Sequence, residues 1–129
     1  MTKFFKFWLP MIVWMGVIFW LSTIPDLESG LKQDFILRKI AHMLEFTILT
    51  FLLIRGLKQE KLNYKKVVLY SLIFALFYAL TDEYHQSFVF GRQCSFKDVG
   101  IDGIGILLMS LVWYIKDKGH YNVEAEERR

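Results

Sequence analysis

The residues best suited to chemistry lie in two short polar stretches, RKIAHMLE at 38–45 and TDEYHQSFVFGRQCSFKDVGIDGIG at 81–105, each bordered by apolar sequence. Charged groups in such surroundings are costly, so a function is expected of them. A histidine flanked by carboxylates can act as a general base near neutral pH. The candidate catalytic residues are His42, Glu45, Asp82, Glu83 and His85.

Other side chains in the same stretches suit binding. Arginine and lysine can hold a phosphate or a carboxylate by charge-assisted hydrogen bonds. The candidate ligand-binding residues are Arg38, Lys39, Gln86, Arg92, Asp98 and Asp102. Mixed histidine and carboxylate ligands could also hold a metal. However, the H-x-x-E and E-x-H spacings differ from the H-E-x-x-H order of zinc hydrolases, so no metal ligand is assigned and no particular cofactor is indicated.

The elements that must position these residues are predicted from composition. The chain has 129 residues, of which 54% are hydrophobic, and a mean hydropathy of +0.32. A small soluble domain cannot hide so much apolar surface in one core, whereas a membrane can accept it. We therefore predict one all-α domain over 1–129, an integral membrane bundle of four transmembrane helices at about 7–24, 38–55, 65–86 and 98–116. A polar tail follows at 117–129, and 25–37 is either a loop or a short amphipathic helix.

Basic residues predict the orientation of the bundle. With four helices, eleven Lys and Arg residues fall on the side of the two termini and the 55–66 loop, against five on the other side. By the positive-inside rule, both termini are expected in the cytoplasm. Because these residues lie in loops beside apolar runs, they indicate topology, and no nucleic-acid partner is expected. The single cysteine, Cys94, excludes an intrachain disulfide.

Helix rise places the polar residues at similar depths. At about 1.5 Å per residue, His42 lies about 20 Å from Arg55, and Asp102 about 21 Å from Lys116. The residues within each stretch recur at i, i+3, i+4 or i+7, which puts them on one helix face. We therefore predict that the second, third and fourth helices turn polar stripes into one shared, water-filled pocket near the outer face.

The motifs resemble those of a known family. R-K-x-x-H-x-x-E-F at 38–46, D-E-x-H-Q-x-F at 82–88, G-R at 91–92 and D-x-x-x-D-x-x-G at 98–105 are similar to the signature of the VanZ-like family. That family of small bacterial membrane proteins is named after an accessory protein associated with teicoplanin resistance. The resemblance implies a multi-pass protein of the bacterial plasma membrane linked to glycopeptide tolerance. It implies no particular reaction.

Several functions remain open from the sequence. The pocket could bind or modify an envelope ligand, such as a lipid headgroup, a cell-wall precursor or a glycopeptide. It could instead be an intramembrane enzyme that uses acid–base or metal-assisted chemistry on a lipid or cell-wall precursor. A third possibility is a purely structural polar network that holds the helices together. The sequence does not indicate the oligomeric state or a partner other than the lipid bilayer.

Overall fold

The computed structural model describes residues 2–23, 32–89 and 96–127, with the backbone alone at 32–35 and 121–126. In order, its elements are η1 (Phe4–Trp8), α1 (Leu9–Thr23), α2 (Lys32–Leu57), α3 (Tyr64–Gln86) and α4 (Phe96–Glu127). Among the described residues, four helical spans are long and apolar enough to cross a membrane: Phe4–Thr23, Ile36–Leu57, Tyr64–Gln86 and Phe96–His120. The predicted all-α fold with four membrane-spanning helices is confirmed.

The first span is continuous, but it changes from a π-helix to an α-helix near Pro10. Pro10 has no backbone N–H, so the carbonyl four residues earlier loses its usual donor. The preceding segment Phe4–Trp8 is a π-helical turn, in which the N–H of Leu9 bonds to the carbonyl of Phe4. Such π turns are a common way for a helix to absorb a local defect.

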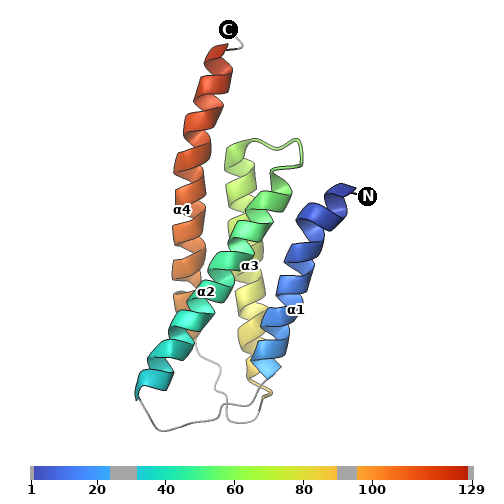
Figure 1. Cartoon of the computed structure of the whole chain (residues 1–129). Coiled ribbons are helices and arrows are strands. Elements are labelled where there is room, and N and C mark those ends of the chain that lie inside the picture. Colours follow the sequence, from blue (N-terminus) through green and yellow to red (C-terminus); the bar gives the residue numbers. More distant parts are fainter. Residues whose placement is uncertain (1, 24–31, 90–95, 128–129) are drawn as a thin grey trace.

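Two helices extend further than the sequence predicted. α2 begins at Lys32, so residues 32–37, predicted as part of either a loop or a short amphipathic helix, form its first turns. α4 continues to Glu127 instead of ending near 116. Neither 32–37 nor 117–127 contains proline, and solvated helix can continue through good helix formers such as Ala, Glu and Lys. In Figure 1, the end of α4 projects beyond the other helices.

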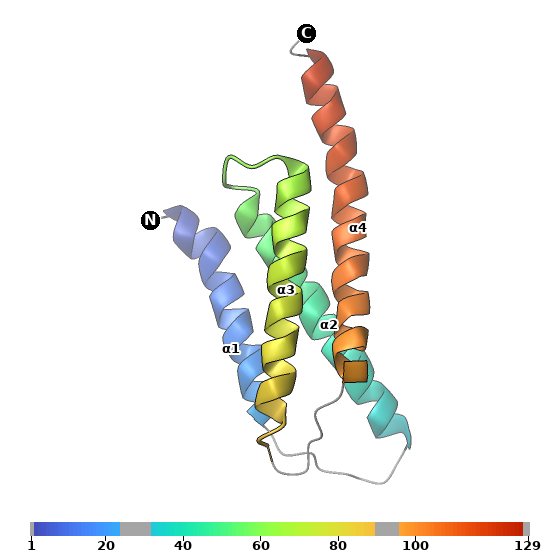
Figure 2. The ribbon, with the colours of Figure 1, turned by 180° about the vertical axis from the view of Figure 1, so that it is seen from behind.

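The helices form an up-and-down bundle in which α3 lies between α1 and α4 (Figures 1 and 2). α4 packs on α2 and α3, whereas α1 packs on α2 and α3 and, within the described ranges, not on α4. The ends of α2 and α4 and the start of α3 lie at one end of the bundle. The starts of α2 and α4 and the end of α3 lie at the other end, which therefore holds the described residues of both polar stretches.

The core is small, and much of the apolar surface faces outward. Fully buried apolar side chains line the centre of the bundle: Ile18, Phe46, Leu49, Ala75, Ala79 and Ile106. In contrast, large side chains such as Phe77 and Ile115 are about two-thirds exposed, at 64% and 65%. In a soluble protein this exposed apolar surface would promote aggregation. In a bilayer it is the surface that contacts lipid.

Directional bonds hold α1 against its neighbours. The indole N–H of Trp14 donates to the backbone carbonyl of Glu45 at 2.9 Å. The hydroxyl of Tyr78 donates to the backbone carbonyl of Met15 at 2.7 Å. A third bond joins the hydroxyl of Ser22 to the carboxylate of Asp82. These bonds supplement sparse packing, because only 11% of the apolar window of the first span is buried.

Candidate functional site

A cluster of acidic side chains around one histidine lies between α2, α3 and α4. We define this acidic cluster as His42, Glu45, Asp82, Glu83 and Asp102. The imidazole Nδ1 of His42 is 3.6 Å from a carboxylate oxygen of Glu45 and 4.0 Å from one of Asp102. His42 thus joins α2 to α4.

Asp102 lies deepest in the acidic cluster. Its side chain is 0% exposed, and neither carboxylate oxygen has a hydrogen-bond partner among the described residues. The carboxylates of Glu83, Asp82 and Glu45 are close enough to act on it electrostatically, as is the ammonium of Lys39. Buried carboxylates normally accept hydrogen bonds from the protein or from ordered water. Among the described residues, the acidic cluster therefore offers more hydrogen-bond acceptors than hydrogen-bond donors.

Asp82 belongs to a smaller network that reaches α1. One of its carboxylate oxygens accepts from the hydroxyl of Ser22, and the other accepts from the amide Nε2 of Gln86 at 2.9 Å. The same amide lies 3.3 Å from the hydroxyl of Ser22. All three side chains are buried. Gln86 therefore orients Asp82 directly, since i, i+4 spacing places both on one face of α3.

Basic residues of α2 lie beside the acidic cluster. Lys39 forms an ion pair with Asp98 of α4. Arg38, one residue earlier, is partly buried and also has an interaction partner. The candidate ligand-binding residue Arg92 lies outside the described residues. Thus Lys39 and Asp98 join the starts of α2 and α4 at the end of the bundle where the cluster lies.

His85 is placed differently from His42. Its ring stacks on Phe19 of α1, with ring centroids 4.3 Å apart and planes inclined by 15°. Its Nδ1 has no hydrogen-bond partner in the part of the chain that the structure describes. The structure therefore brings one of the two candidate histidines, His42, between carboxylates and sets the other against an aromatic ring.

The cluster is closely packed. Asp82, Glu83 and Asp102 are buried, while the side chains of His42 and Glu45 remain 14% and 13% exposed. Within the described residues, no three His, Cys, Asp or Glu side chains gather as a metal would require. The chemistry available to the cluster is proton transfer through His42, or acceptance of hydrogen bonds from a ligand at the partly exposed edge of His42 and Glu45.

Sequence reasoning missed the contribution of α1. Ser22 and Phe19 contact candidate residues, yet the first helix has no charged group to draw attention to it. The sequence did contain a signal, because Ser22 is one of the few hydroxyl side chains in that apolar run and lies near its C-terminal end. A buried hydroxyl in a membrane helix commonly hydrogen-bonds to a neighbouring helix.

Comparison with known proteins adds one match. The protein-family model described as VanZ/LLP1 matches residues 7–117. No curated protein and no solved structure matches the chain. The matched region includes the whole of the second and third membrane spans, most of the first and fourth, and every residue of the acidic cluster.

Proposed function

The chain belongs to the VanZ/LLP1 family, and from this premise we propose that its acidic cluster is an outward-facing site that binds or modifies a ligand of the cell envelope. Through this ligand, the protein supports bacterial tolerance of glycopeptide antibiotics of the teicoplanin type. The multi-pass membrane fold agrees with such a place of action.

The observation that carries the proposal is the unmatched acceptor capacity of Asp102. A network whose only role is to hold helices together should saturate its buried carboxylates, since each unsatisfied group is destabilising. In the described residues, both oxygens of Asp102 lack a hydrogen-bond partner while other carboxylates lie nearby. At the partly exposed edge formed by His42 and Glu45, such a cluster favours ligands rich in hydroxyl or ammonium donors, such as the sugar or amine groups of cell-wall precursors and glycopeptides.

A second candidate function, acid–base catalysis, is favoured by the position of His42. Its Nδ1 faces carboxylate oxygens of Glu45 at 3.6 Å and Asp102 at 4.0 Å. An adjacent carboxylate fixes the tautomer of an imidazole and stabilises its protonated form. The remaining ring nitrogen, Nε2, would then take a proton from a hydroxyl or from water. This reaction would act on the same ligand class, a lipid or a cell-wall precursor.

His42→Gln is expected to abolish tolerance while leaving the folded protein in the membrane. Glutamine keeps a hydrogen-bonding side chain but cannot exchange a proton near neutral pH. The minimum inhibitory concentration of teicoplanin for expressing cells should fall to that of cells carrying the empty vector. Protein abundance and thermal unfolding in detergent are measured in parallel.

The matched control is Glu60→Gln, which changes an exposed side chain in the loop at the opposite end of the bundle. It should leave tolerance unchanged. If His42→Gln lowers tolerance only in proportion to the amount of folded protein, the cluster is a structural network and the proposal fails.

The orientation of the bundle is part of the proposal, with both termini in the cytoplasm of a bacterium and the acidic cluster at the outer face. Its support is the excess of Lys and Arg on the side of the termini. Cys94, which lies outside the described residues, falls in the sequence between α3 and α4. A membrane-impermeant thiol reagent is therefore expected to label it in intact protoplasts.

The control for this labelling is a Cys94→Ser variant that carries Glu60→Cys in the α2–α3 connection. Its thiol should react only after the membrane is opened. If Cys94 reacted only after the membrane is opened, and the thiol of Glu60→Cys reacted in intact protoplasts, the acidic cluster would lie on the cytoplasmic side.

A further inference from the structure

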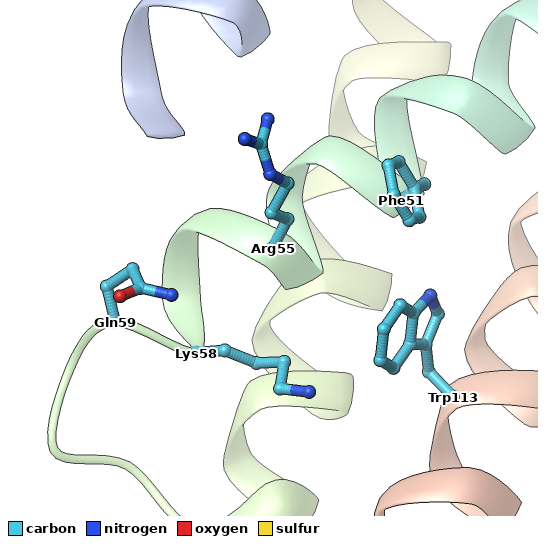
Figure 3. A pocket seen from close by; sticks show the side chains of 5 residues that line it. All are labelled: Phe51, Arg55, Lys58, Gln59 and Trp113. Atoms are coloured by element: carbon cyan, nitrogen blue, oxygen red, sulfur yellow. The ribbon is translucent and has the colours of Figure 1, made fainter. Parts of the chain in front are cut away.

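A separate cavity lies at the opposite end of the bundle from the acidic cluster. It has a volume of about 300 Å³ and is lined by Phe51, Arg55, Lys58, Gln59 and Trp113. The first four residues come from the last turns of α2 and the residues just after it, and Trp113 comes from α4 (Figure 3). We call it the basic–aromatic cavity.

Cations contact aromatic rings at this cavity and beside it. The ammonium of Lys58 lies 4.4 Å from the ring centroid of Trp113, and that of Lys116 lies 4.9 Å from it. Figure 3 shows the side chains of Lys58 and Trp113 pointing toward each other. The guanidinium of Arg55 lies 5.0 Å from the ring of Phe7. The aromatic faces hold the cations near the cavity without neutralising them.

Within the described residues, the carboxylate found among these cations is that of Asp117, whose oxygen lies 3.0 Å from the ammonium of Lys58. With Arg55, Lys58 and Lys116 nearby, the local formal charge remains positive. Lys58 is about one-third exposed, whereas the side chain of Asp117 is only 12% exposed, so one side of the ammonium stays accessible beside this ion pair. An anion that enters the cavity would therefore compete with Asp117 for the ammonium of Lys58.

The cavity lies near one end of two membrane-spanning helices. The second span ends at Leu57 and the fourth at His120, so Lys58 and Gln59 follow the second span directly, and Trp113 lies seven residues before the end of the fourth. Tryptophan is enriched at the membrane–water boundary, and basic pockets between membrane helices bind anionic headgroups. Phe51, one turn deeper than Arg55, supplies an apolar wall on the membrane side.

We propose that the basic–aromatic cavity binds the phosphate of an anionic phospholipid, with the glycerol backbone against Phe51 and Trp113. The volume suits a headgroup, whose acyl chains would continue along the lipid-exposed surfaces of α2 and α4. The ion pair of Lys58 with Asp117 then competes with the lipid phosphate for the same ammonium. This proposal is independent of any role of the acidic cluster.

The test is a lipid titration of the full-length protein in neutral detergent, followed by native mass spectrometry with phosphatidylglycerol and with phosphatidylcholine. Wild type is expected to retain phosphatidylglycerol preferentially. Arg55→Gln and Lys58→Gln should each raise the Kd for phosphatidylglycerol about fivefold, the usual contribution of one basic residue near a charged lipid. Lys65→Gln, an exposed lysine at the same end but outside the cavity, is the matched control and should leave the Kd unchanged.

A gain of binding separates this proposal from general damage to the fold. Asp117→Asn removes the competing carboxylate and is expected to lower the Kd for phosphatidylglycerol, which a misfolded protein cannot do. Inorganic phosphate is titrated against the lipid as a second arm and should not displace it. Equal Kd values in wild type and both basic variants, no gain in Asp117→Asn, or full displacement by inorganic phosphate would each overturn the lipid assignment.

Discussion

Asp102→Asn is expected to make the protein more stable and, at the same time, inactive. The substitution keeps the shape of the side chain but removes a carboxylate that is 0% exposed and lacks hydrogen-bond partners among the described residues. The new amide can also donate a hydrogen bond to one of the nearby carboxylates of Glu83, Asp82 and Glu45. Relief of an unsatisfied buried group is worth about 1–3 kcal/mol in the free energy of unfolding.

The measurement is the unfolding transition in detergent, alongside teicoplanin tolerance. Asp98→Asn is the matched control, since it is the same substitution on the same helix one turn earlier. It breaks the ion pair with Lys39 and should leave stability unchanged or lower it slightly. If Asp102→Asn instead lowers stability, then Asp102 is a structural partner of the cluster, and the argument from unmatched acceptors is wrong.

Gly105→Ala is expected to destabilise the crossing of α2 and α4 more than any other glycine-to-alanine change on α4. A Cβ atom at this position would lie 2.5 Å from the backbone carbonyl oxygen of Met43 and would also collide with the hydroxyl of Thr47. A backbone carbonyl cannot change its rotamer as a flexible side chain can, so α2 and α4 must move apart. Overpacking of this kind costs about 1–3 kcal/mol, and the backbone contact places Gly105 at the upper end.

Gly103→Ala provides the control on the same helix. The nearest atom to a Cβ there is Cδ2 of Leu76 at 3.7 Å, an ordinary van der Waals contact. This substitution should be neutral or stabilising, because alanine favours helix over glycine by roughly 0.5–1 kcal/mol. The measurement is the free energy of unfolding of both variants in detergent. If Gly105→Ala is as stable as the wild type and Gly103→Ala, the α2–α4 crossing tolerates added volume at Gly105 and the prediction is wrong.

Periodicity and depth explain what the sequence could predict. Apolar run lengths predict four spanning helices, and helix rise places His42 and Asp102 at one level. In the structure, Nδ1 of His42 and an oxygen of Asp102 are 4.0 Å apart. The helical period also predicts which residues share a face, such as Asp82 and Gln86. Run length, helix rise and helical period are properties of one helix at a time, so they can be predicted from the sequence of that helix alone.

The rotation of one helix against another could not be predicted in this way. Ser22 reaches Asp82, and His85 turns to Phe19, only because α1 packs with one face toward α3. The first helix is apolar almost all round, so its sequence carries little information about which face is buried. The basic–aromatic cavity was missed for a related reason. Lys58 and Trp113 are ordinary boundary residues in sequence, and only tertiary packing brings them together.

The attachment of α1 has a mechanical consequence. Its bonds are made at the adjacent residues Trp14 and Met15 and, about two turns later, at Ser22, so sliding or turning the helix would break them together. One helical turn is about 5.4 Å, and no intermediate position reproduces the same donors and acceptors. The depth of this helix is therefore set by the protein. A thicker or thinner bilayer should tilt the bundle as a unit, because the helix cannot follow the lipid independently.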